Sequence, residues 1–192
     1  MKAAKPIALV LALAGTSVLA WVLVTLTWGE PFTAVSQARA QAALRGELEH
    51  PASSRRPTRP EEGHAFGRLV IPRLGLRTVA VEGTDSNDLA RGPGHYPSTS
   101  MPGSGGVVAV AGHRTTYGHP FRHIDDLRPG DRIDVQMPYG DYRYVVYGKR
   151  VVDDRNWSIL RPRKFEKLVL TACHPLYSAS QRYAVFARLQ AA

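Results

Sequence analysis

Hydrophobic positions divide the chain into an apolar N-terminal segment, a polar middle and a C-terminal part with short alternating runs. Residues 6–29 carry no charge, and as a helix rising ~1.5 Å per residue they would reach ~36 Å. A bilayer core is ~30 Å thick, so the segment is long enough to span it. Lys2 and Lys5 precede it. The positive-inside rule then places residues 1–5 in the cytoplasm and the remainder outside.

A cleaved signal peptide is the alternative interpretation of this segment. Ala38-Arg39-Ala40 resembles a small-x-small cleavage site. An h-region, however, usually runs only ~7 to 15 residues, whereas this apolar segment is longer and ends about ten residues before the cleavage candidate. We therefore expect a retained anchor, which makes the protein a single-pass protein of the cell membrane.

A polar region follows the apolar segment. Residues 33–50 are rich in Ala and Gln, a composition compatible with a helix, while residues 51–63 are dense in Pro, Ser, Arg and Glu. We expect residues 30–65 to be an extracellular linker. It would hold a folded domain, residues 66–192, at a distance from the bilayer and leave it free to reorient.

From Phe66 onward, short β-type runs alternate with Gly, Pro and Asp, which predicts a mostly β domain in the form of a closed barrel or a sandwich. Short helical turns fit Ser86–Arg91, capped by Asp85 or Ser86, and Pro120–Leu127. A hairpin turn fits residues 138–141. The expected strands are Arg68–Ile71, Thr78–Val81, Gly106–Ala111, Arg132–Met137, Tyr142–Val152, Lys167–Ala172 and Arg182–Leu189.

The formal net charge is +9, and residues 66–192 contribute 18 Lys and Arg against 11 Asp and Glu. This excess favours anionic neighbours such as nucleic acid, lipid headgroups or wall polymers. The cations are scattered singly, and the aromatic residues lie in alternating apolar runs rather than on a basic stacking platform. That pattern argues against a nucleic-acid partner.

Cys173 is the single cysteine, so the chain cannot contain an intramolecular disulfide. In an exported protein the thiol is then an inert packed group, an intermolecular link or a reactive group. Its position favours reactivity. It follows an apolar strand ending at Ala172, and Pro175 ends that strand because proline lacks a ladder donor.

Two further side chains are expected beside the thiol. His113 follows the apolar run Val107–Ala111 and Gly112. If the two strands are parallel neighbours, ~4.8 Å apart, His113 and Cys173 share one rim. Arg182 begins the next strand, and a hairpin would return its guanidinium towards the thiol, where a cation lowers a thiol pKa or binds an oxyanion.

The segment 170–175, Leu-Thr-Ala-Cys-His-Pro, followed by Arg182, resembles the sortase signature, with a Thr two residues before the Cys and a Pro two after it. Three other segments resemble the class E sortases in particular. They are residues 92–97 (Gly-Pro-Gly-His-Tyr-Pro), 112–118 (Gly-His-Arg-Thr-Thr-Tyr-Gly) and 127–131 (Leu-Arg-Pro-Gly-Asp).

The resemblance implies an eight-stranded β-barrel in which His113, Cys173 and Arg182 match the catalytic residues of the family one by one. It implies a transpeptidase that cleaves an LAXTG- or LPXTG-type signal between Thr and Gly through a thioacyl-enzyme. The partners would be secreted proteins with a C-terminal sorting signal and an amine of a peptidoglycan precursor. No cofactor or metal is implied. We also expect substrate contacts from Thr171, which alternation places on the face of Cys173, and from Tyr96 and His95.

Four alternatives are compatible with parts of this pattern. A zinc site at His113, His119 and His123 is disfavoured because Pro120 interrupts the stretch and no further Cys or His completes a tetrahedral set. An L,D-transpeptidase would carry its Cys in a Ser-His-Gly-Cys setting, which is absent. A non-enzymatic β domain that binds wall polymers through its basic surface, or a different cysteine peptidase, stays open at this point.

Overall fold

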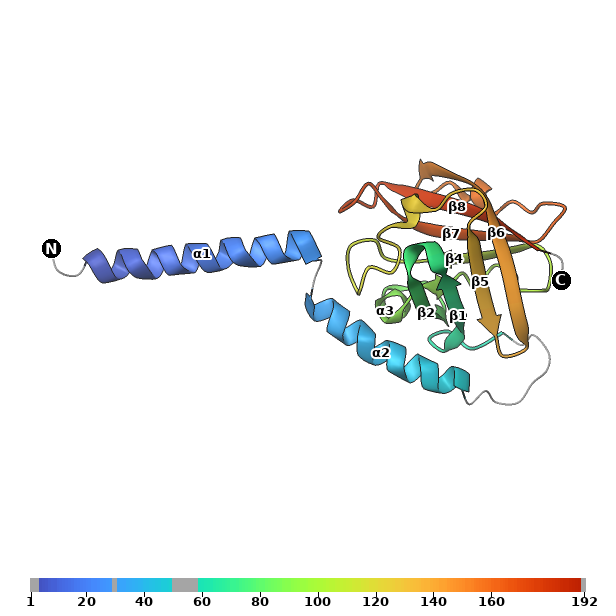
Figure 1. Cartoon of the computed structure of the whole chain (residues 1–192), viewed down its shortest axis with the longest axis horizontal. Coiled ribbons are helices and arrows are strands. Elements are labelled where there is room, and N and C mark those ends of the chain that lie inside the picture. The colour runs from blue at the N-terminus through green and yellow to red at the C-terminus, as the bar shows by residue number, and fades with distance from the viewer. Residues whose placement is uncertain (1–3, 29–30, 50–58, 191–192) are drawn as a thin grey trace.

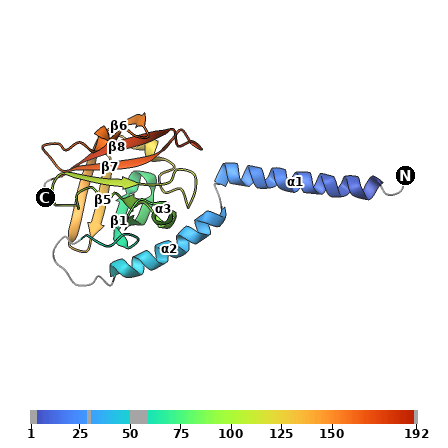
Figure 2. The ribbon, with the colours of Figure 1, turned by 180° about the vertical axis from the view of Figure 1, so that it is seen from behind.

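The computed structural model describes residues 4–28, 31–49 and 59–190. Within these ranges, two N-terminal helices precede a closed β-barrel (Figure 1; Figure 2). Residues 1–3 of the expected cytoplasmic N-terminus and residues 50–58 of the expected linker lie outside the described ranges.

Eight strands close the barrel in the order β1-β2-β3-β4-β7-β8-β6-β5. All neighbouring pairs are antiparallel except β2–β3 and β4–β7, which are parallel. The strands are β1 (Ala65–Ile71), β2 (Leu76–Glu82), β3 (Gly94–His95), β4 (Val107–Ala111), β5 (Arg132–Met137), β6 (Gly140–Asp153), β7 (Lys167–His174) and β8 (Gln181–Leu189).

The expected barrel is confirmed, and so are all seven expected strands, with ends shifted by at most three residues. The eighth strand, β3, was missed because two residues are too few to show a period of two. Its two residues pair with β2 on one side and β4 on the other, and so close the barrel.

The barrel is closed around an apolar interior whose largest members include Tyr144, Phe121 and Leu168. Val185 and Ala187 of β8 point into it, whereas Ala184 and Phe186 lie on the outer face, as alternation predicted. A second apolar cluster covers that outer face beneath the turn η3 (Trp157–Leu160). The sheet that carries β4, β7 and β8 is therefore packed on both faces.

Short helical turns fill the connections. The helix α3 (Ser86–Arg91) matches the prediction, with Asp85 as N-cap in a capping box. The turn expected over Pro120–Leu127 is reduced to η2 (Ile124–Asp126), and η1 spans Pro72–Leu74. Just before this segment, Tyr117 and His119 adopt positive φ angles of 49° and 40°, so a right-handed helix cannot extend through them.

The helix α1 (Ala4–Trp28) projects away from the barrel (Figure 1). Its described side chains are exposed, including Leu11 at 67% and Leu19 at 68%. Residues Pro6–Val24 are long and apolar enough to cross a membrane. The helix is therefore a candidate membrane anchor.

The helix α2 (Pro31–Glu49) packs against the barrel, although the sequence predicted that this region belongs to a linker. Leu44 is fully buried against Val79 and Val81 of β2. The Gln41 side chain donates to the carbonyl oxygens of Val79 and Arg91 and accepts from the Val79 N–H, each at 2.8 Å. The expectation of a free spacer is thus wrong for α2, since helix and barrel share buried apolar surface.

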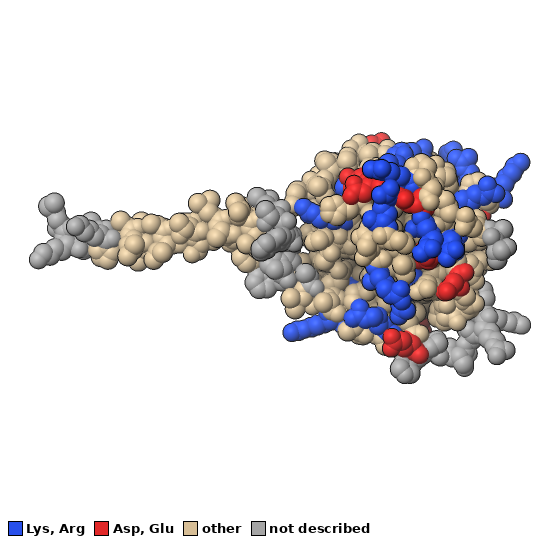
Figure 3. All heavy atoms as spheres, viewed as in Figure 1, with Lys and Arg blue, Asp and Glu red and all other residues tan. Residues whose placement is uncertain are grey.

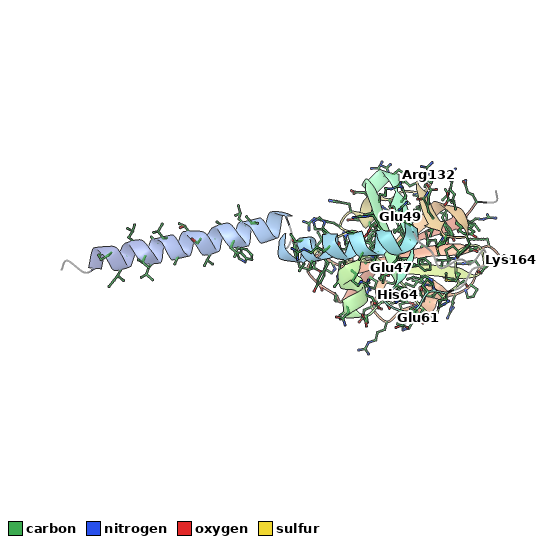
Figure 4. All side chains as sticks on the ribbon, turned by 90° about the horizontal axis from the view of Figure 1, so that it is seen from below. Glu47, Glu49, Glu61, His64, Arg132 and Lys164 are labelled. Carbon is green, nitrogen blue, oxygen red and sulfur yellow. The ribbon has the colours of Figure 1, made fainter. Side chains whose placement is uncertain are left out.

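The far end of α2 is fixed by Glu47. Its carboxylate accepts from the Ala65 N–H at 2.8 Å and lies 3.4 Å from His64 and 3.8 Å from Arg91. Figure 4 shows α2 lying across the barrel with Glu47 beside His64. The helix is therefore held along its length.

If α2 is part of the folded unit, Leu44→Ala will lower the free energy of unfolding by about 2–5 kcal/mol, the usual cost of deleting a buried Leu side chain. Urea unfolding of the full chain measures this change. Arg45→Ala on the exposed side of the same helix is the matched control and should change stability by less than about 0.5 kcal/mol. Equal, small effects of both substitutions would contradict the docking.

Candidate active site

The parallel pairing of β4 with β7 brings two strand ends to one rim of the barrel. Ala111 pairs with Thr171, and the Gly112 N–H donates to the Thr171 carbonyl oxygen at 3.0 Å. His113 and Cys173 follow at the ends of these two strands. The predicted parallel arrangement of the two strands is therefore confirmed.

The antiparallel pairing of β7 with β8 places Arg182 directly opposite Cys173. The Arg182 guanidinium donates to the carbonyl oxygens of Ala179 at 2.8 Å and Gln181 at 2.9 Å. These bonds use one nitrogen of the five-donor guanidinium, so donors remain for a ligand. The connection between the strands thus holds the cation beside the thiol.

All three predicted side chains line one cavity of about 190 Å³. Cys173 is a free, half-buried thiol, so it is not enclosed by the core. The cavity is lined by Thr84, Leu89, Tyr96, Ala111, Gly112, His113, Thr171, Ala172, Cys173 and Arg182. A nucleophile, an imidazole and a fixed cation therefore face the same space, which is the set of groups needed for acyl transfer through a thioester.

The His113 imidazole is half-buried and packs on the Tyr117 ring, with centroids 5.1 Å apart. Its Nε2 atom has no hydrogen-bond partner among the described residues. Burial lowers the pKa of His113, because the charged ring loses water without gaining a countercharge. The ring is therefore neutral at neutral pH and able to accept a proton from the thiol.

The loop that follows His113 rests on the start of α2. The Tyr117 N–H donates to Thr33 Oγ1 at 2.9 Å. Gly118 approaches Gln37 so closely that a Cβ there would collide with the Gln37 side chain, and its φ of +66° also favours glycine. The helix that leads from the candidate anchor thus supports the loop bearing the imidazole.

Arg114 also belongs to this site, and sequence reasoning assigned it no role. Its side chain is only 3% exposed and lies over the Tyr183 ring. It bonds to Asp125 Oδ1 at 2.8 Å, to the carbonyl oxygen of Cys173 at 3.4 Å and to His174 Nδ1 at 3.3 Å. Arg114 therefore ties the loop of His113 to the strand end of Cys173. The position of Arg114 directly after His113 in the sequence is the feature that could have indicated this role.

Two of the three expected substrate contacts line the cavity. Thr171 is buried at 2% exposure, and its hydroxyl lies 3.1 Å from the Tyr96 hydroxyl. The Tyr96 ring meets the Trp157 ring edge-on, with centroids 6.4 Å apart. Tyr96 thus forms the wall between the cavity and the turn η3.

His95 does not face the cavity, so the expected substrate contact is wrong for this residue. Its side chain is fully buried and stacks on Phe66 at 4.1 Å. Nδ1 lies 2.8 Å from the equally buried Glu82, and Nε2 lies 3.1 Å from Thr99 Oγ1. The neighbouring Tyr96 points to the opposite face, as alternation along an extended segment requires.

The histidines considered as zinc ligands lie in different environments. His113 lies in the cavity, whereas the His123 side chain is 69% exposed, with Nδ1 3.6 Å from Asp126. Within the part of the chain that the structure describes, no three His, Cys, Asp or Glu side chains gather as a metal-binding group.

A comparison with models of protein families shows to which family this chain belongs. The model of the sortase domain matches residues 69–190, which include both strand ends and the cavity between them. The chain belongs to the sortase family. Sortases are cysteine transpeptidases, which agrees with a free thiol beside an imidazole and a guanidinium.

Relatives of two sortase classes resemble this sortase. Sortase D of Bacillus subtilis is 33% identical over 71% of this chain and 70% of its own length. Sortase SrtE1 of Streptomyces coelicolor is 33% identical over 91% of this chain, which spans 54% of the length of SrtE1. The solved sortase E of Streptomyces avermitilis aligns with a TM-score of 0.62 at 34% identity, covering 69% of this chain and 91% of that structure.

The buried imidazole predicts a pH dependence of stability. The pKa of His113 is lowered on folding from about 6.5. As the pH falls through about 6.5, the unfolded chain binds this proton before the folded protein does, so the free energy of unfolding decreases. Wild type should lose more stability between pH 8 and pH 5 than His113→Gln, as measured by urea unfolding. Parallel curves for the two proteins would contradict the burial.

The contacts of Arg114 predict a loss of turnover rather than of substrate affinity. Arg114→Gln breaks the tie between the His113 loop and Cys173, and a misplacement of about 1 Å lowers kcat by roughly ten- to a hundredfold. Steady-state kinetics with a sorting-signal peptide measures this loss, and Arg114→Lys should recover part of it. If only the melting temperature falls and kcat is retained, Arg114 has a purely structural role.

Proposed function

We propose that this sortase is a membrane-anchored transpeptidase that cleaves a sorting signal of the LAXTG or LPXTG type between Thr and Gly and transfers the acyl group to a cell-wall amine. The proposal rests on one observation: the pairing of β7 with β4 and β8 brings Cys173, His113 and Arg182 to one cavity. The substrates would be secreted proteins with a C-terminal signal, and the acceptor an amine of a peptidoglycan precursor.

In the acylation step, the Cys173 sulfur attacks the carbonyl carbon of the signal Thr. The sulfur–carbon bond forms and the carbon–nitrogen bond to Gly breaks. His113 takes the thiol proton and gives it to the departing Gly amine, so charge and protons balance. Arg182 lies opposite Cys173 and stabilises the negative charge that develops on the carbonyl oxygen.

The second step reverses the roles. The incoming amine attacks the thioester carbon, His113 accepts the proton that the amine loses, and the thiolate of Cys173 leaves and is reprotonated. The neutral ring favoured by burial is the form that accepts this proton. Thr171 and Tyr96, which line the cavity beside the thiol, would contact the signal.

The path of the chain supports action next to a membrane. The α1 helix is a candidate anchor, and α2 begins three residues after α1 ends. The start of α2 contacts Tyr117, close to His113, so the chain enters the domain at the rim that bears the active site. The rim would therefore face the bilayer from which both the signal and a lipid-linked acceptor are presented.

The relatives support either class D or class E for this sortase, since both are 33% identical to it. The segments around His113 and His95 favour class E, for which LAXTG is the typical signal. Paired peptides that differ only by Ala or Pro at the second position of the signal would discriminate. We expect the Ala peptide to give the higher kcat/KM.

Formation of a hydroxamate tests the chemistry. With hydroxylamine as acceptor, a sortase converts the signal peptide to a Thr hydroxamate, whereas a wall-binding β domain gives no product. Cys173→Ala should lower the rate at least about 10³-fold, because it removes the nucleophile. A thiol-directed alkylating agent should also abolish turnover with one adduct per chain, since Cys173 is the single cysteine.

A matched pair of histidine substitutions serves as the control. His113→Gln should lower turnover strongly, while His123→Gln alters an exposed side chain outside the cavity and should leave turnover unchanged. Hydroxamate formation that persists in Cys173→Ala, or full turnover after stoichiometric alkylation, would refute the proposed nucleophile.

A further inference from the structure

A second cavity, of about 530 Å³, lies between β6, β8 and the connection that leads from η3 to β7. It does not share a residue with the active-site cavity. Five cationic residues line it: Lys149 and Arg150 on β6, Arg161 and Arg163 in the connection, and Lys167 at the start of β7. The Lys149 ammonium donates to the Asp125 carbonyl oxygen at 2.6 Å. We call this cavity the basic pocket.

The cations of the basic pocket lack carboxylate partners. No Asp or Glu lines it, and none of its five cationic residues forms an ion pair with another described residue. Elsewhere on the domain, exposed arginines do pair, such as Arg73 with Asp131 at 2.6 Å and Arg143 with Asp134 at 3.0 Å. Figure 3 shows Lys and Arg spread over the visible face of the barrel, with Asp and Glu among them.

The cations of the basic pocket repel one another. Lys167 is 3% exposed, and its ammonium donates to the carbonyl oxygens of Ile159 and Arg161 at 2.8 and 2.7 Å. Burial lowers the pKa of Lys167, and the positive charges of Arg163 and Arg150 lower it further. A bound anion would relieve this repulsion, so the pocket is complementary to negative charge.

The position of the basic pocket relative to Cys173 restricts its ligand. Lys167 and Cys173 lie at opposite ends of β7, six residues or about 20 Å apart. The Cys173 end is the rim at which α2 enters from the candidate anchor. Lys167 therefore lies at the end remote from the candidate anchor, which disfavours a lipid headgroup as its ligand. Arg150 lies closer to the active-site rim, because it pairs with Ala184, the partner of Thr171.

The direction of the substrate chain follows from the same geometry. In the proposed reaction the signal is near the C-terminus of the substrate, so the bulk of that protein precedes the signal. A folded protein cannot fit between the active-site rim and the bilayer. In the proposed reaction, the segment that precedes the signal would leave the cavity away from the membrane, and the wall formed by Tyr96 and Trp157 lies between the cavity and the turn η3 that borders the basic pocket.

We propose that the basic pocket binds acidic side chains of the substrate, about six to ten residues before the scissile Thr, the distance that an extended chain needs to cover 20 to 30 Å. This inference rests on the proposed function and adds a determinant of specificity to it. The contact forms equally in the ground state and the transition state, so it should act on KM rather than on kcat.

Two peptides and one double variant test the inference with the full-length enzyme. The peptides carry the same signal and, six to ten residues before its Thr, either three Glu or three Gln. For wild type at low salt, the KM for the Glu peptide should be roughly five- to tenfold lower than the KM for the Gln peptide. This ratio of the two KM values should shrink as salt screens the charges. In Arg161→Gln/Arg163→Gln the ratio should fall to about one. The substitutions spare the Arg161 carbonyl oxygen that accepts from Lys167.

The control variant Arg77→Gln/Arg128→Gln removes the same charge from exposed positions outside the pocket and should keep the wild-type ratio. Arg161→Glu/Arg163→Glu should instead prefer a peptide with three Lys. A wild-type ratio near one, with the Gln peptide turned over normally, overturns the inference but leaves the proposed function intact. Turnover of neither peptide refutes the proposed function itself.

Competition with long-chain polyphosphate tests the remaining possibility, that the basic pocket binds an anionic polymer instead of the substrate. If polyphosphate binds wild type but not the Gln double variant, while the peptide ratio stays near one, the pocket serves an anionic polymer and the inference about the substrate is wrong. If polyphosphate raises the KM of the Glu peptide and leaves that of the Gln peptide unchanged, both ligands compete for the pocket and the inference is supported.

Discussion

The register of β7 between its two neighbours is the constraint on which the site depends. Parallel pairing with β4 sets Ala111 beside Thr171, and antiparallel pairing with β8 sets Arg182 beside Cys173. Side chains alternate along a strand, so a slip of one residue would turn the thiol into the barrel interior, the face on which the Ala172 side chain now packs. Packing on both faces of this sheet fixes the register, because Leu170 and Val169 are both fully buried on opposite sides.

This constraint explains why the site could be anticipated from sequence. Apolar runs that end beside His113 and Cys173 leave one residue of each at a strand end, and Pro175 marks the second of these ends. The parallel pairing of the two strands was only a condition at that point, and the resemblance of the motifs to those of the sortases supplied the set of three residues. Features that depend on tertiary contacts were not accessible in this way. The strand β3 exists because its two residues find partners on both sides, and no pattern within two residues signals that.

The same distinction separates His95 from Tyr96. Composition placed both in a substrate-contacting loop, but only burial shows that His95 points inward to Glu82 while Tyr96 reaches Thr171. The docking of α2 was not predicted for a related reason. Its Ala- and Gln-rich composition is compatible with a helix, but the face that packs on the barrel combines Leu44 and Leu48 with the polar Gln37 and Gln41. Because half of these side chains are polar, their helical spacing gives no hydrophobic signal.

The arrangement also gives the domain a polarity along β7. At one end α2 supports the loop of His113, so the residues that follow the candidate anchor are joined to the candidate active site. At the other end, Lys167 belongs to a pocket whose cations lack carboxylate partners. In the proposed reaction, the folded part of a substrate held by its C-terminal signal would lie beyond the barrel, and the segment before the signal would pass these cations. Charge there would then select substrates without altering the chemistry.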